Sequence, residues 1–367
     1  MPATRLPALL RPAAAFGARP AVADPDGEWS YAELAARSSR VAAALLGGRD
    51  DLEEARVALL APPGRSYVSG QWGTWLAGGV SVPLSPQHTP REWAHVLDDS
   101  RATELIVAPG HDGAIRALAD ARGIRVAATG AAALAPGPGA GDRPPLPGVD
   151  DERRALMLYT SGTTSLPKGA VLTHGNLRAQ VECLTRAWEW EPADRALHVL
   201  PLNHTHGVIN ILACALWNGA ACEFPGGFDA ALTWRRFAGG GISVFMAVPT
   251  IYGRLIAAWR EAPPDVRSAW AQAAARLRLF VSGSAALPVP VLEEWRAITG
   301  HTLLERYGMT EIGMALSNPL RGERRPGFVG TPLPGVEVRL VGDDGEDVAG
   351  AAPGELFVRG PGVFREY

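Results

Sequence analysis

"YTSGTTSLPKGA", residues 159–170, gathers five serine and threonine hydroxyls, two glycines and one lysine. Such a stretch is typical of a phosphate-binding loop, because glycines allow close backbone approach and successive N–H groups form an anion-binding nest. It is not the common P-loop, which ends in Gly-Lys-Ser/Thr and leads directly into a helix. Here Lys168 precedes Gly169, and the following AVLTH is typical of a strand. We therefore expect a hairpin-like connection in which Lys168 supplies a point charge for a terminal phosphate.

Helices and short apolar strands alternate before this loop. Residues 28–46 predict a helix, and Ser30 and Glu33 have the spacing of a capping box at its start. ARVALLAP, residues 55–62, predicts a buried strand, and residues 66–86 and 91–109 each predict a helix followed by a strand. This alternation predicts an α/β fold with mostly parallel sheets.

The length of 367 residues exceeds what one simple core usually holds. We expect two α/β subdomains, at about 1–175 and 176–315, and a small β-barrel-like subdomain at about 316–367, where glycine and proline punctuate short strands. Residues 126–150 are rich in alanine, glycine and proline, which predicts a linker just before the phosphate loop.

Composition excludes several functional classes. The net charge is −3 and no basic stripe occurs, so we expect no nucleic-acid partner. No stretch approaches the roughly 20 apolar residues of a membrane span, so we expect no membrane insertion. Cys183, Cys214 and Cys222 lie in apolar stretches without metal-ligand spacing, which favours buried thiols in a reducing, cytoplasmic setting.

The loop resembles the signature of the adenylate-forming enzymes, the superfamily of acyl-CoA synthetases, luciferases and peptide-synthetase adenylation domains. Their pattern is close to T-S-G-T-T-G-x-P-K-G, and this sequence departs from it at Ser165, where glycine is usual. The resemblance implies that the loop holds the β- and γ-phosphates of ATP. The residues to which it assigns this role are Thr160, Ser161, Gly162, Thr163, Thr164 and Lys168.

Two further motifs fit the same nucleotide. LFVSGSAALP, residues 279–288, predicts a strand that opens into a turn of small residues, and the resemblance places adenine against Gly283, Ala285 and Ala286. Taken alone, the turn favours an ordinary strand-to-helix connection over an adenine site. ERYGMTE, residues 305–311, matches the family's Y-G-x-T-E motif. The resemblance implies the following roles: Tyr307 and Gly308 at the adenine, Thr310 at the α-phosphate, and Glu311 as a ligand of Mg²⁺.

PLNHTHGV, residues 201–208, matches a third family region, in which a histidine lies near the reacting carboxylate. The matching residue is His206. His204 and His206 do not form a metal pair on this reading, because no third ligand stands nearby in the sequence. A histidine in an apolar stretch is also compatible with a structural role. The expected catalytic residues are Lys168, His206, Thr310 and Glu311.

Arg306 indicates the acid. A buried guanidinium left unpaired costs about 3–5 kcal/mol, and a carboxylate satisfies it well. Residues 281–288 and 304–311 closely resemble malonyl-CoA synthetases, which implies that Ser284 and Arg306 hold the free carboxylate of malonate or methylmalonate; Met309 is a further expected substrate contact. The alternative is that Arg306 pairs with an internal acid, Glu305 or Glu311.

The expected co-substrates are ATP with Mg²⁺ and CoA, and the expected reaction forms an acyl-adenylate and then a thioester, in fatty acid metabolism. The family continues for about 100 or more residues as a mobile C-terminal domain that has no counterpart before Tyr367. The resemblance therefore implies that this chain binds nucleotide but has little activity without that partner domain. Two rival functions remain open: a synthetase for another carboxylic acid, and a nucleotide-binding module without catalysis.

Overall fold

The computed structural model describes residues 6–111, 113–127, 146–160, 166–348, 350 and 352–367. The chain divides into two units that are discontinuous in sequence. The first comprises Met1–Arg178, Glu191–Gly227 and Arg365–Tyr367, and the second comprises Ala179–Trp190 and Phe228–Phe364. Most of the expected linker, residues 128–145, lies outside the described residues, as do residues 161–165 of the phosphate loop.

The larger sheet of the first unit is the α/β sheet expected from the sequence. Its strand order is β6-β5-β3-β4-β7-β8, and every neighbouring pair is parallel except β7 and β8. The strands are β3 (Arg56–Leu60), β4 (Val80–Leu84), β5 (Glu104–Val107), β6 (Arg125–Val126), β7 (Arg154–Thr160) and β8 (Lys168–Thr173).

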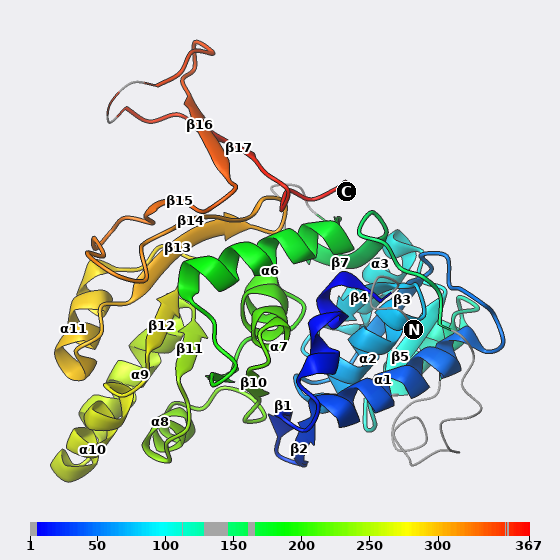
Figure 1. The fold of residues 1–367 in the computed structure, drawn as a ribbon, viewed down its shortest axis with the longest axis horizontal. Coiled ribbons are helices and arrows are strands. Elements are labelled where there is room, and N and C mark those ends of the chain that lie inside the picture. The colour runs from blue at the N-terminus through cyan, green and yellow to red at the C-terminus, as the bar shows by residue number, and fades with distance from the viewer. Residues whose placement is uncertain (1–5, 112, 128–145, 161–165, 349, 351) are drawn as a thin grey trace. The chain divides into compact units, whose positions relative to one another are not determined.

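Helices pack on both faces of that sheet (Figure 1). One face of β3 and β4 forms a buried apolar cluster with two helices, through residues such as Leu60, Val82, Leu97 and Ile115. On the other face, the side chain of Leu59 packs directly over Gly70. The helices are α1 (Tyr31–Leu46), α2 (Arg65–Leu76), α3 (Pro90–Ser100) and α4 (Gly113–Asp120). An α/β fold with mostly parallel strands is thus confirmed.

A second group of strands in the first unit has the order β9-β10-β1-β2, with only β1 and β2 antiparallel. Two 3₁₀ turns precede it, η2 (Ala8–Leu10) and η3 (Pro12–Ala15). A π-helix, η4 (His206–Ala213), runs into the short α7 (Cys214–Trp217). The strands are β1 (Pro20–Asp24), β2 (Gly27–Ser30), β9 (Arg195–Leu197) and β10 (Ala221–Glu223).

The second unit contains a mixed sheet in the order β15-β14-β13-β12-β11. β11, β12 and β13 are parallel neighbours, whereas β14 and β15 are antiparallel. The strands are β11 (Val244–Ala247), β12 (Leu279–Ser282), β13 (Leu304–Met309), β14 (Gly313–Ser317) and β15 (Thr331–Pro332). The helices are α8 (Ala230–Ala238), α9 (Pro249–Glu261), α10 (Pro264–Ala274) and α11 (Val289–Thr299), while α6 (His174–Trp188) runs from the first unit into the second.

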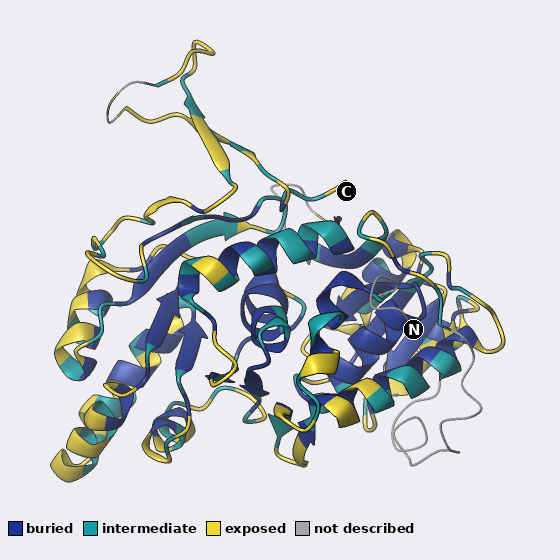
Figure 2. Cartoon of the chain, in the orientation of Figure 1, coloured by how far each residue is buried: buried dark blue, intermediate teal, exposed yellow. Residues whose placement is uncertain are grey.

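The antiparallel ribbon of β16 (Glu337–Val341) and β17 (Glu355–Arg359) follows, where β-structure was expected. Its residues are mostly exposed, while β11 and β12 are buried throughout (Figure 2). The three-part division of the chain with a β-barrel-like third subdomain stays a prediction. Among the described residues, no helix combines the length and hydropathy of a membrane span.

A local signal in the sequence explains where helix α1 begins. The Glu33 amide donates to the Ser30 hydroxyl oxygen at 3.3 Å, and the Ser30 amide donates to the Glu33 carboxylate at 2.8 Å. The expected capping box is therefore confirmed, and such a cap stabilises a helix by about 1 kcal/mol. All three cysteines are free and buried, as expected.

Candidate functional site

The phosphate-loop motif begins and ends on a β-hairpin of the first unit. Thr160 at the end of β7 pairs with Lys168 at the start of β8, so the expected strand–loop–strand connection is confirmed. Helix α3 holds both stems of the loop. The Tyr159 hydroxyl donates to Asp99 at 2.7 Å, and the His95 imidazole donates from Nε2 to the Pro167 carbonyl at 2.9 Å. Ser161, Gly162, Thr163 and Thr164 lie outside the described residues.

Lys168 is exposed, and its ammonium lies 5.4 Å from the ring centroid of Tyr367. It is also the single lysine of a chain that contains 34 arginines. Arginine stands at the other Lys/Arg positions of the chain, whereas residue 168 has a compact ammonium with three rotatable donors. This exclusive use of lysine supports a specific role, and the signal was present in the sequence.

His206 begins the π-helix η4 and is 5% exposed. π-helical turns occur frequently at functional sites. A hydrogen bond holds the start of this helix: the His198 imidazole donates from Nε2 to the Gly207 carbonyl at 3.0 Å. Burial lowers the pKa of His198 to about 4. Four residues after His206, the side-chain amide of Asn210 is fully buried and has no hydrogen bond to any described residue. Asn210 belongs to none of the motifs recognised in the sequence.

The turn after β12, in the second unit, has an unusual backbone. Ser284 has a φ angle of 68°, in the left-handed region that L-residues rarely adopt. Ser284, Ala285 and Ala286 are exposed, whereas Gly283 is buried. Backbone strain of this kind concentrates at binding sites. Because the exposed residues of the turn are small, a planar ligand can lie close to its backbone.

Arg306, on β13, faces this turn and is only 3% exposed. One terminal nitrogen of its guanidinium lies 3.5 Å from the Ser284 hydroxyl, and its Nε makes no hydrogen bond to the described residues. No acidic side chain within the described ranges forms an ion pair with it. Burial lowers the pKa of Arg306 to about 10, and the nearby Tyr252 hydroxyl acts in the opposite direction.

Glu305 does not neutralise Arg306. Successive side chains of a strand point to opposite faces of the sheet. The Glu305 carboxylate accepts instead from the Leu287 amide at 3.1 Å, and burial raises its pKa. Tyr252, for its part, donates from its hydroxyl to the Val281 carbonyl at 2.8 Å and is fully buried among aromatic rings.

The rest of the Y-G-x-T-E motif lies at the end of β13. Tyr307, Thr310 and Glu311 are partly exposed, and Met309 is 48% exposed. Gly308 lies at a register shift between β13 and β14, where a Cβ atom would come within 2.1 Å of the Gly313 carbonyl oxygen. Glycine is therefore required there by the close approach of the two strands.

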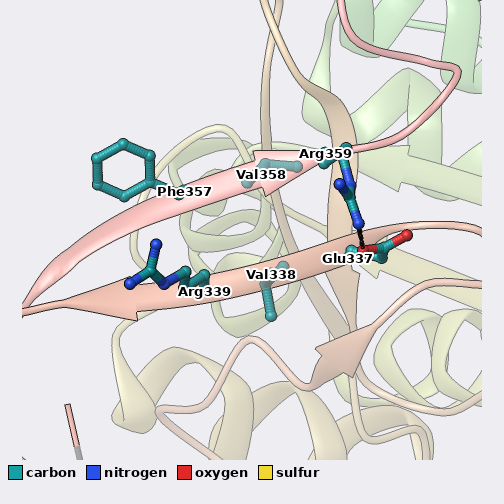
Figure 3. A pocket seen from close by; sticks show the side chains of 6 residues that line it. All are labelled: Glu337, Val338, Arg339, Phe357, Val358 and Arg359. Atoms are coloured by element: carbon teal, nitrogen blue, oxygen red, sulfur yellow. Dashed lines mark hydrogen bonds and ion pairs between the residues drawn. The ribbon is translucent and has the colours of Figure 1, made fainter. Parts of the chain in front are cut away.

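The candidate residues that the structure describes thus fall into two groups, one in each unit. Thr160, Lys168 and His206 belong to the first unit, and the turn, Arg306 and the motif through Glu311 belong to the second. Within the described ranges, no three acidic, histidine or cysteine side chains cluster as metal ligands. A hollow of about 350 Å³ on the β16–β17 ribbon contains none of the motif residues; it is lined by Glu337, Val338, Arg339, Phe357, Val358 and Arg359 (Figure 3).

The chain belongs to the AMP-binding enzyme family, whose model matches residues 9–367. It is 44% identical to the mitochondrial malonate–CoA ligase of Bos taurus, over 97% of this chain and 66% of that protein. It is 39% identical to the malonate–CoA ligase of Arabidopsis thaliana, over 93% of this chain and 61% of that protein. The chain thus spans about two thirds or less of the length of these relatives.

Solved structures agree in fold. ATP-bound MatB from Rhodopseudomonas palustris superposes with a TM-score of 0.85 at 33% identity, over 98% of this chain and 71% of that one. A malonyl-CoA ligase in a ternary product complex with methylmalonyl-CoA and AMP gives a TM-score of 0.82 at 37% identity, over 100% of this chain and 73% of that one. These matches place the fold among adenylate-forming enzymes.

Proposed function

We propose that the protein activates malonate, and methylmalonate as an alternative substrate, to an acyl-adenylate and then to the CoA thioester, with release of pyrophosphate and AMP. The observation that carries this proposal is the state of Arg306: a guanidinium that is 97% buried, given its 3% exposure, with an Nε that no described residue satisfies. A buried cation of this kind requires an anionic partner.

A substrate with two carboxylates meets this requirement. One carboxylate pairs with Arg306 and the Ser284 hydroxyl, and the other remains available for activation. A monocarboxylate such as acetate leaves the guanidinium unsatisfied, and a site built to bind a polar group rejects analogues that lack it by factors of about 10⁴. The names of the similar proteins, which are malonate–CoA ligases and a methylmalonyl-CoA complex, support the same acid.

The remaining residues are assigned to ATP by the family's motifs. Lys168 and the threonine and serine groups of its loop hold the β- and γ-phosphates, Tyr307 stacks on adenine, and Thr310 donates to the α-phosphate. His206 contacts the reacting carboxylate. Glu311 supplies the hard oxygen donor that Mg²⁺ prefers, and the ion, when bound, reduces the repulsion between the two anions that react.

The chemistry needs no side-chain nucleophile. A carboxylate oxygen of malonate forms a bond to the α-phosphorus of ATP while the bond from that phosphorus to the pyrophosphate oxygen breaks. Because both reactants are anionic, cationic groups and fixed donors carry most of the acceleration. Arg306 keeps the second carboxylate away from the phosphates, so only one end of the acid reacts.

The test compares acids. Pyrophosphate release by the whole gene product is measured with malonate, methylmalonate, succinate and acetate, and the same assay is repeated with Arg306→Ala. We expect malonate to exceed acetate by orders of magnitude and Arg306→Ala to abolish the difference. Equal rates with malonate and acetate would overturn the dicarboxylate assignment and would favour a synthetase for another acid.

This chain by itself is proposed to bind ATP and malonate and to turn over slowly, since the relatives extend beyond the matched part. Binding of an ATP analogue without malonate binding would favour the nucleotide-binding module. The cellular compartment stays a prediction: the buried free thiols suit a reducing compartment, and the similar bovine protein is named as mitochondrial.

A further inference from the structure

We propose that Gly283 is a positioning residue that seats the guanidinium of Arg306 beside the Ser284 hydroxyl and thereby determines dicarboxylate specificity. Gly283 acts by having no side chain, whereas Ser284 contributes its hydroxyl at the tip of the guanidinium, in spite of a left-handed backbone that would suit glycine better. The inference rests on the proposed malonate site and assigns to Gly283 a role different from the adenine contact that the family resemblance implies.

The space above Gly283 is filled by Arg306. A Cβ atom at residue 283 would lie 2.5 Å from Cζ, 2.6 Å from Nε and 2.7 Å from Nη1 of that side chain. These distances are far below van der Waals contact, so the guanidinium lies flat against the backbone of Gly283. The backbone of Gly283 itself does not have a left-handed φ angle. Glycine is therefore needed here for space and not for conformational freedom.

The next residue shows the opposite situation. Ser284 does adopt a left-handed φ angle, 68°, where glycine would be free of strain. The serine hydroxyl lies 3.5 Å from the second terminal nitrogen of Arg306. On backbone conformation alone, we would expect glycine at residue 284 and serine at residue 283. The order found in the chain is explained by Arg306, which needs an empty surface on one side and a hydroxyl at its tip.

The seat fixes the direction of the charge. Arg306 extends from β13, past Gly283, to the exposed turn that begins at Ser284. The flat face of the guanidinium lies against the backbone of Gly283, so the group has little freedom to turn. Its Nε has no partner among the described residues. The guanidinium therefore presents its unused donors to a ligand in a fixed orientation. Displacing it by the width of a methyl group would misalign a bidentate carboxylate contact.

The first test needs no ligand. Thermal unfolding is measured for the wild type, Gly283→Ala, Arg306→Ala and the double variant. We expect Gly283→Ala to lower Tm by about 2–5 °C in the wild-type background and to have almost no effect when Arg306 is truncated. Gly253→Ala is the matched control, because a Cβ at that helical position meets nothing within 4 Å. An equal loss of Tm in both backgrounds would overturn the seat.

The second test measures affinity. Malonate is titrated by calorimetry into the chain saturated with α,β-methylene ATP and Mg²⁺. We expect Gly283→Ala and Ser284→Gly to weaken malonate binding by about tenfold or more, and to change the affinity for the ATP analogue less than twofold. Ser284→Gly should also raise Tm, because it relieves the left-handed strain, whereas Ser284→Ala should lose malonate affinity without that gain.

The outcomes separate the two proposals. If the wild type binds no malonate, the proposed function fails, and the thermal comparison still decides whether Gly283 acts through Arg306. If Arg306→Ala loses malonate while Gly283→Ala binds it like the wild type, the function stands and the seat is wrong. Should Gly283→Ala not fold, recovery of folding in the Gly283→Ala/Arg306→Ala double variant supports the seat, and failure of the double variant to fold overturns it.

Discussion

Glu305 and Arg306 are adjacent acidic and basic residues of one strand, yet their charged groups serve opposite faces of the sheet. The Glu305 carboxylate accepts from the Leu287 amide, and the Arg306 guanidinium extends to Ser284. Both side chains are at least 96% buried, since their exposed fractions are 4% and 3%. Two consecutive residues of the strand thus carry buried ionisable groups that do not form an ion pair with each other. Stability alone does not favour this arrangement.

Replacing Arg306 should separate stability from function. Arg306→Met removes an uncompensated buried charge and keeps most of the volume, so we expect the free energy of unfolding to stay equal or to rise by about 1 kcal/mol. Malonate binding should fall by about 100-fold or more. Urea unfolding and calorimetric titration measure the two quantities.

Arg324 offers the matched control. Its guanidinium donates to the carbonyls of Pro319, Thr302 and Leu320, so Arg324→Met leaves these acceptors without their donor. We expect this variant to lose about 2 kcal/mol of stability and to bind malonate normally. A loss of stability in Arg306→Met as large as that in Arg324→Met would contradict the unsatisfied state of Arg306.

Glu305 predicts a pH dependence of defined sign. Burial raises its pKa above the ordinary value of 4.5, so the folded state binds a proton that the unfolded state has released. The stability from this proton is full below pH 4.5 and is lost as the pH rises through the raised pKa. Glu305→Gln keeps the acceptor for Leu287 and carries no charge. We therefore expect it to be more stable than the wild type at pH 7, with a difference that shrinks toward pH 4.

Glu33 should show the opposite sign in the same experiment. Its hydrogen bonds from the backbone and hydroxyl of Ser30 lower its pKa, so its contribution is present above pH 4.5 and is lost as the pH falls through the lowered pKa. Glu33→Gln should accordingly be less stable than the wild type at pH 7. Thermal unfolding from about pH 2 to pH 8 compares both variants across the titration of each carboxyl group, and identical pH profiles for the two would refute the assignment.

Lys168 should not be replaceable by the cation that the rest of the chain uses. Lys168→Arg keeps the charge but substitutes a planar fork for a compact ammonium, and we expect the affinity for α,β-methylene ATP to fall by about tenfold. Lys168→Met should fall further and should lose part of the salt dependence of binding. Titration at two salt concentrations measures this, with the exposed Arg91→Lys as the control. Full ATP affinity in Lys168→Met would remove this residue from the site.

Gly308 should tolerate no side chain. A Cβ atom there would lie 2.1 Å from the Gly313 carbonyl oxygen and 2.8 Å from the Met314 Cα, both backbone atoms that cannot turn aside. We expect Gly308→Ala to lose about 2 kcal/mol or more in urea unfolding. Gly253→Ala, in an open helical position, should gain up to about 1 kcal/mol. Equal stability of Gly308→Ala and the wild type would show that β13 and β14 do not approach each other this closely at Gly308.

Local signals made much of the fold predictable. The Ser30 and Glu33 spacing predicted a capping box, and the alternating helices and apolar strands predicted the α/β sheet, because these patterns act between near neighbours in the chain. The π-helix at His206–Ala213 was not predicted, since its hydrophobic pattern does not distinguish a π-helix from an α-helix. The discontinuous units were not predicted either, because residues 179–190 leave the first unit through long-range contacts that local patterns do not encode.

The sequence by itself determined which chemical groups are available: a hydroxyl-rich loop with the single lysine, a turn of small residues, and an arginine placed before a tyrosine and a glycine. Only the tertiary structure decided which of these groups meet. Gly283 and Arg306 are 23 residues apart and lie on neighbouring parallel strands or their extension, so their contact follows from the register of β12 and β13. Burial, which depends on everything packed around a side chain, then turned one arginine among many into a cation that requires a ligand.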